Sequence, residues 1–119
     1  MTTLSCPAVA NLDAWSSHEW THGLQIDTLP DLETLAVRTR NNTYEISVIS
    51  HATGEVLVRG GLFFPEYTRA HLAGSSLGGS FLKRHGIYVG FRMELQREAE
   101  TIVTTEVRSI KRKSDHVVQ

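Results

Sequence analysis

Hydrophobic and polar residues alternate without a break in the stretch GIYVGFRMELQ, residues 86–96. In an extended chain, one side of this stretch carries its large apolar side chains, which are Ile87, Val89, Phe91, Met93 and Leu95. A period of two is typical of a β-strand with one buried face. The pattern therefore predicts a strand whose odd-numbered side chains enter a hydrophobic core.

Four further segments show a similar alternation and are joined by residues typical of turns. They are residues 33–40, 43–50, 55–61 and 101–110. Asn41-Asn42 favours a tight turn after the first segment, and Gly54 suits the turn after the second. The paired glycines Gly60 and Gly61 indicate a bulge or a sharp bend. Short strands separated by turn signals predict an antiparallel sheet.

The segment PEYTRAHLAG, residues 65–74, carries the signals of a short helix instead. Pro65 suits the first helical position, His71 lies towards the end, and Gly74 follows as a stop. These segments together predict an all-β fold, a small antiparallel β-barrel of five to six strands with one short helix. Closure suits a chain of 119 residues, because so small a domain has to cover the apolar face of every strand.

Charge is distributed unevenly along the chain. Residues 1–32 are expected to form an irregular acidic leader, residues 33–110 the barrel and residues 111–119 a flexible C-terminal tail. Up to position 33 the chain has no Lys or Arg, whereas all twelve lie between Arg38 and Lys113. This split indicates either a leader that covers the barrel or two surfaces with different partners. The formal net charge of -1 argues against a protein dedicated to nucleic acid.

Cysteine content and hydropathy bear on the compartment. Cys6 is the single cysteine, so no disulfide can form within the chain, which favours a reducing environment. The N-terminal residues lack a basic region followed by an apolar run, and no apolar run approaches the roughly 20 residues that a membrane-spanning helix needs. A cytoplasmic protein without membrane contact is therefore expected.

The strongest motif match is HEWTH, residues 18–22, which fits H-E-x-x-H. On a helix, His18 and His22 would share a face and hold zinc while the glutamate between them activates water. The motif resembles that of the zincin metalloproteases, and this resemblance implies a zinc-dependent hydrolase. The third histidine of the extended motif is missing, which leaves Glu45 or Glu55 as the third ligand. Zinc is kept as the alternative to a protein without a cofactor.

A second candidate is a glycine- and serine-rich loop that could present backbone N–H groups to an anion. Its candidate ligand-binding residues are Gly74, Ser75, Ser76, Gly78, Gly79 and Ser80. A phosphate-binding P-loop would have lysine at position 80, and the strand–helix–strand context of such a loop is also missing. The loop therefore predicts either a nucleotide or phosphate site or a connection in which glycines satisfy tight turns.

The stretch from Ser75 to Ile110 is similar in rhythm to PilZ domains, small β-barrels that bind cyclic di-GMP. In that family a D/N-x-S-x-x-G loop precedes two long strands, and Ser75 and Gly78 match its serine and glycine. Ala73 stands at the acidic or amide position, and the family's upstream R-x-x-x-R pair is missing. The resemblance thus implies a barrel architecture more than a particular ligand site.

Arginines at the polar positions of the predicted strands form a third candidate site. These outward residues are Arg38, Arg40, Arg92 and Arg108. Tyr88 is also expected outward, and arginine beside an exposed aromatic ring is typical of surfaces that bind nucleic acid or phosphorylated groups. The alternative is cross-strand neutralisation by Glu45, Glu94 and Glu106.

The sequence favours a small binding or interaction module without enzymatic activity, self-associating through an edge strand in one version of this hypothesis. Its partner is unknown, with a small anionic ligand, a nucleic acid or a second copy of the chain left open. The zinc hydrolase and the nucleotide-binding barrel are the alternatives.

Overall fold

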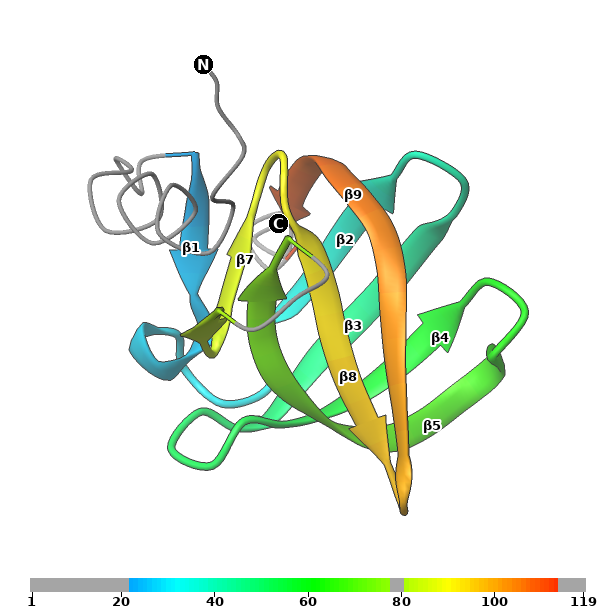
Figure 1. The fold of residues 1–119 in the computed structure, drawn as a ribbon. Helices are drawn as coiled ribbons and strands as arrows, with labels where there is room; N and C mark the ends of the chain where they lie inside the picture. The colour runs from blue at the N-terminus through cyan, green and yellow to red at the C-terminus, as the bar shows by residue number, and fades with distance from the viewer. Residues whose placement is uncertain (1–21, 78–80, 114–119) are drawn as a thin grey trace.

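A computed structural model describes residues 22–77 and 81–113. Most of these residues lie in antiparallel β-strands (Figure 1). The strands are β1 (Gly23–Gln25), β2 (Thr34–Thr39), β3 (Thr43–Ser50), β4 (Glu55–Gly60), β5 (Phe64–Ser76), β6 (Leu82–Arg84), β7 (Gly86–Tyr88), β8 (Arg92–Arg97) and β9 (Glu100–Arg112). One short 3-10 turn, η1 (Ile26–Thr28), follows β1.

Six strands form a ring within the described part of the chain. Their order is β2-β3-β4-β5-β8-β9, and β9 pairs with β2 to complete it. The first half of β5 pairs with β4, and its second half lies between β8 and β6. Closure leaves the ring without an open edge, since each of its six strands is hydrogen-bonded to a neighbouring strand on both sides. The prediction of a small antiparallel β-barrel is confirmed.

The barrel interior is filled by side chains from every second position along the strands. On β2 and β3 these include Leu35, Val37, Ile46 and Val48, all with no exposed surface. Met93 and Leu95 of β8 are buried in the same way, as the alternation in residues 86–96 predicts. Burying one such side chain contributes about 1.5–3 kcal/mol, so this core is the main source of stability.

The predicted helix over residues 65–74 is wrong, because this segment lies in strand β5. Ala70, Leu72 and Gly74 are buried and alternate with partly exposed residues, which is the period of a strand. The signals of Pro65 and Gly74 are local and weak, whereas pairing with β4 and β8 satisfies the whole backbone of the segment. Tertiary pairing overrides the helix signals.

The predicted strand over residues 86–96 is interrupted. It divides into β7 and β8 at a turn, where Gly90 has a φ of 93°. Val89 is 38% exposed instead of buried, and Tyr88 is buried instead of outward. Phe91 is again only 7% exposed. The side chains of β8 therefore follow the predicted alternation, whereas β7 is buried along its whole length and Val89 at the turn is exposed.

Residues outside the predicted barrel also form regular structure. β1 pairs with β7 beside the barrel, although both β1 and η1 lie in the segment expected to be irregular. Lys111 and Arg112, expected in a flexible tail, continue β9. The N–H of Lys113 donates to the carbonyl of Thr34 at 2.9 Å. Within the described residues, no helix has the length and apolar character needed to cross a bilayer.

Candidate functional site

Strand β2 positions two of the predicted arginines on the outside of the barrel. Val37 and Thr39 point into the interior and are buried, so Arg38 and Arg40 between and beyond them point outward. Both arginines are exposed. The alternation of a strand with one buried face thus places two guanidinium groups on the same surface.

Strand β9 brings a third arginine to this surface. Arg38 lies opposite Ser109, and Thr39 lies opposite Val107, so the register shifts by one residue between these pairs. Such a bulge is a local irregularity that redirects side chains. Arg108 lies within it and joins Arg38, Thr39 and Arg40 around a shallow hollow of about 250 Å³. We call these four residues the arginine hollow.

A second hollow of about 370 Å³ adjoins the first and is almost entirely polar. It shares Arg38, Thr39 and Arg40 with the arginine hollow and adds residues of two turns, which are Asn41, Asn42, Thr43 and Gly61. The Thr39 hydroxyl lies 3.1 Å from both the N–H and the carbonyl oxygen of Asn42. This contact holds the β2–β3 turn in place beside the arginines.

The charges of the arginine hollow are not neutralised within the described residues. Other cations of the barrel have carboxylate partners: Arg59 and Lys113 contact Glu45, Arg97 contacts Glu100, and Arg112 contacts Glu33. Arg38, Arg40 and Arg108 form no ion pair among residues 22–77 and 81–113. The three guanidinium groups therefore create a local excess of positive charge on a chain of net charge -1.

Arg92, the fourth predicted arginine, lies outside this group. It is half-buried on β8, opposite Glu106 of β9, and does not line the arginine hollow. Tyr88, expected beside the arginines, is buried, and its hydroxyl lies 3.0 Å from Oε1 of Gln25. The structure thus brings together three of the four arginines without the exposed tyrosine.

The described part of the glycine- and serine-rich segment is the end of β5. Ser75 is fully buried, its hydroxyl donates to the carbonyl of Gly86 at 2.9 Å, and it accepts from the N–H of Tyr88 at 3.1 Å. The Ser76 hydroxyl donates to Glu94 at 2.5 Å. These groups join β5 to β7 and β8. Gly78, Gly79 and Ser80 lie outside the described residues.

The HEWTH segment lies almost wholly outside the described residues, which include only His22 of its five positions. His22 is exposed, and its carbonyl accepts from the N–H of Val89 at 2.8 Å. Glu45, considered as a third zinc ligand, is engaged by Arg59, Tyr67 and Lys113. Within the part of the chain that the structure describes, no three His, Cys, Asp or Glu side chains converge on a common point.

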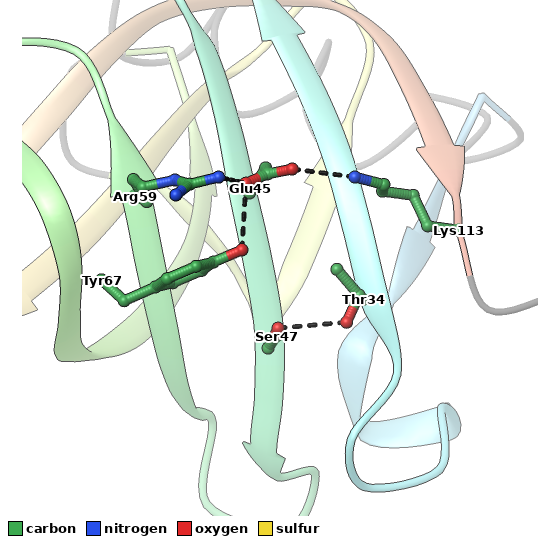
Figure 2. A network of polar contacts seen from close by, with 6 residues as sticks. All are labelled: Thr34, Glu45, Ser47, Arg59, Tyr67 and Lys113. Atoms are coloured by element: carbon green, nitrogen blue, oxygen red, sulfur yellow. Dashed lines mark hydrogen bonds and ion pairs between the residues drawn. The ribbon is translucent and has the colours of Figure 1, made fainter.

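Figure 2 shows the contacts around Glu45, which link side chains from several strands. Tyr67 donates to Oε1 at 2.9 Å, Lys113 donates to Oε2 at 2.8 Å, and the Arg59 guanidinium contacts Oε1. These partners, led by Lys113, lower the pKa of Glu45 from its ordinary value of 4.5 to about 2. The carboxylate is therefore fully charged and compensated at neutral pH, so this network stabilises the barrel wall.

The sequence pattern identifies the arginines of the hollow but not its polar neighbours. It indicates Asn41 and Asn42 only as residues of a turn, Thr43 only as the start of a strand, and Gly61 only as part of a bend. The available signal is the position of Asn41-Asn42 directly after two outward arginines. Nothing in the pattern indicates that the β4–β5 turn lies beside it.

Comparison of the chain with protein-family models, with curated proteins and with solved structures gives no match. The chemistry of the arginine hollow therefore has to be judged from its own groups. Guanidinium groups stay protonated at physiological pH and donate hydrogen bonds in a planar fork that fits phosphate oxygens. The hollow is suited to hold an anion rather than to transfer a proton.

Proposed function

We propose that this protein is a small non-enzymatic binding module whose arginine hollow holds the phosphate groups of a nucleic acid. The observation that carries the proposal is the gathering of Arg38, Arg40 and Arg108 around one hollow of about 250 Å³. None of the three forms an ion pair among the described residues. Cations left uncompensated on a folded surface attract a polyanion and release its counterions on binding.

The shape of the site favours backbone recognition over reading of the sequence. The arginine hollow is shallow, and its lining within the described residues contains no aromatic ring on which a base could stack. Contacts to phosphate position a nucleic acid without selecting its sequence. The amide and hydroxyl groups of Asn41, Asn42 and Thr43 add neutral hydrogen-bonding groups at the edge. A nucleic acid held through its phosphate backbone, with little sequence preference, is the ligand proposed.

The proposal is tested by the fluorescence anisotropy of a labelled single-stranded oligonucleotide, titrated with protein at several salt concentrations. Three phosphate contacts predict that log K falls with log salt with a slope of about -2. Replacing Arg38 and Arg108 with alanine should make this slope shallower by about 0.7 per arginine, because each variant residue no longer neutralises a phosphate. Affinity should fall equally for oligonucleotides of different sequence.

The matched control is Arg69→Ala. Arg69 is an exposed arginine of β5, and β5 lies across the ring from β2. Its removal changes the net charge as much as removal of Arg38 but should leave the slope unchanged. Equal loss of affinity in the Arg69 and Arg38 variants would contradict a defined site, and undetectable binding at low salt would end the proposal.

Self-association is a second candidate, and the turn between β4 and β5 favours it. Leu62 is 92% exposed and Phe63 is 51% exposed at the tip of this turn. Adjacent exposed apolar residues at a turn suit contact with a partner surface, here proposed to be a second copy of the chain. Because the ring is closed, its strands have no free edge that could pair with a second copy. The β4–β5 turn is therefore the proposed contact surface.

A cytoplasmic location is part of the same proposal. It is supported by the single cysteine of the chain, since cytoplasmic proteins keep their thiols reduced. The zinc-dependent hydrolase and the nucleotide- or phosphate-binding barrel have no support from the described residues, because most of HEWTH and residues 78–80 of the glycine-rich loop lie outside them.

A further inference from the structure

Two histidines from distant parts of the chain meet on the outside of the barrel. His71 lies on β5, where Ala70 and Leu72 on either side of it point inward, and His85 lies in the turn between β6 and β7. Their ring centroids are 5.8 Å apart, and the ring planes cross at 70°. The N–H of His85 donates to the carbonyl of Ala73 at 2.9 Å, so the backbone holds the two rings near each other.

Each ring has a buried nitrogen without a hydrogen-bond partner. These atoms are Nδ1 of His71 and Nε2 of His85. The His85 residue is only 5% exposed, although most buried polar atoms in proteins are satisfied. A buried polar atom left without a partner destabilises the folded protein. Two such atoms on neighbouring rings suggest a shared group that satisfies both.

We propose that His71 and His85 form a transition-metal site that binds Zn²⁺. Imidazole nitrogens are preferred zinc ligands, with Zn–N distances of about 2.0–2.1 Å. Adding roughly 1.1 Å from nitrogen to ring centre, two imidazoles on one tetrahedral or slightly wider ion have centroids about 5–6 Å apart. The observed separation of 5.8 Å lies in this range.

The surroundings of His85 keep its ring available as a ligand. Burial, followed by the neighbouring charge of Arg84, lowers the pKa of His85 below its ordinary value. A lowered pKa favours the neutral imidazole, which is the form that binds metal. A methyl group at Gly54 would lie 2.8 Å from Nε2 of His85, so the absence of a side chain at this position leaves room for the imidazole.

Solvent can supply the remaining ligands. His71 lines a hollow of about 530 Å³ together with Glu55, Arg69 and Gln96. Glu55 and Gln96 are the register partners of His71 on β4 and β8. Since no three His, Cys, Asp or Glu side chains converge within the described residues, the protein provides two ligands there. Both nitrogens are buried, so water can complete the coordination only from the side where the hollow beside His71 opens. Such a partial set predicts binding weaker than that of a structural zinc site.

The test is calorimetric titration of Zn²⁺ into tag-free protein with the substitutions His18→Ala and His22→Ala, which remove the HEWTH imidazoles. This protein should still bind one zinc ion, and adding His71→Ala or His85→Ala should weaken binding at least tenfold. His51→Ala is the matched control, because His51 is an exposed histidine whose Nδ1 contacts Asp31 at 2.7 Å. It should leave the affinity unchanged. Mg²⁺, which prefers oxygen ligands, should give no heat.

Electron paramagnetic resonance with Cu²⁺ in place of zinc gives a second readout. Hyperfine coupling to two imidazole nitrogens is expected and should decrease to one in the His71→Ala protein. That variant also keeps the test decisive if His85→Ala does not fold, because His71 is partly exposed on an otherwise intact strand. Unchanged zinc affinity in His71→Ala would overturn the proposal, as would zinc binding that disappears with His18 and His22 alone. Nucleic-acid binding at the arginine hollow is independent of all these outcomes.

Discussion

Gly74 lies where β5 passes close to the backbone of β6. A Cβ atom at this position would lie 2.1 Å from the carbonyl oxygen of Lys83, and its φ is 149°. We expect Gly74→Ala to lower the free energy of unfolding by at least about 3 kcal/mol, because both the backbone conformation and the contact oppose a side chain. Chemical denaturation followed by far-ultraviolet circular dichroism, which reports on the strands of the barrel, measures this loss.

Gly90 separates the cost of the backbone conformation from the cost of the steric contact. Its φ of 93° is also one that side chains rarely adopt, but nothing lies within 4 Å of the Cβ position. Gly90→Ala should therefore cost only about 1–2 kcal/mol, the backbone part of the penalty. Equal losses of stability in the two variants would mean that the backbone at Lys83 moves away from the new methyl group at no cost in free energy.

For single residues, the sequence predicts whether a side chain points inward or outward better than it predicts which distant residues lie beside it. Outward positions for Arg38 and Arg40 follow from alternation alone, whereas that of Arg108 also depends on the bulge in β9. All three arginines line the arginine hollow. The prediction for Tyr88 is wrong because this residue precedes a turn that reverses the chain. The nearness of His71 and His85 could not be predicted, since it depends on how the β6–β7 turn packs against β5.

Among the elements, β3 carries a carboxylate on which β4, β5 and the end of β9 converge. The pKa of Glu45 is lowered from 4.5 to about 2 by hydrogen bonds, first from Lys113. A lowered pKa contributes stability that is complete above pH 4.5 and is lost as the pH falls towards 2. Glu45→Gln should destabilise the protein by about 1–2 kcal/mol at pH 7, a value reduced by solvent screening.

The measurement is denaturation of the wild type and the Glu45→Gln variant at pH 7, 4 and 3. The difference in stability between the two proteins should shrink as the pH falls, because the wild type loses the charge that the variant lacks. Glu66→Gln serves as the control, since Glu66 is an exposed residue of β5 without an ion pair among the described residues. If the difference in stability did not change with pH, the contacts of Glu45 would stabilise the protein without depending on the negative charge of its carboxylate.

Elements differ in how well their sequence specifies them. β3 has the predicted bounds because its apolar residues alternate between clear turn signals. The segment 65–74 has helix-favouring residues at both ends, but its register with β4 and β8 decides the outcome. Hydrogen bonds between strands are long-range, and a single-sequence pattern contains no information about them. For the same reason, the position of the β4–β5 turn beside the arginines could not be predicted.

For the whole molecule, the exposed turn between β4 and β5 predicts the oligomeric state. If Leu62 and Phe63 contact a second copy, replacing both with serine should shift the protein from dimer to monomer in light scattering at matched concentration. Leu32→Ser is the control, because Leu32 is 80% exposed but lies before β2, away from this turn. A monomeric wild type would exclude self-association, and an unchanged dimer in the double variant would place the interface elsewhere.

The pairing of β2 with β9 also has a consequence for how the chain is made. Leu35 of β2 lies opposite Arg112 of β9. The first strand of the ring therefore has no partner on this side until the last strand has been synthesised. During translation the nascent polypeptide exposes an unclosed, apolar sheet until the residues of β9 have left the ribosomal tunnel. Contacts between such distant residues slow folding. Newly synthesised copies should therefore depend on chaperones, which would shield the open sheet until β9 can pair with β2.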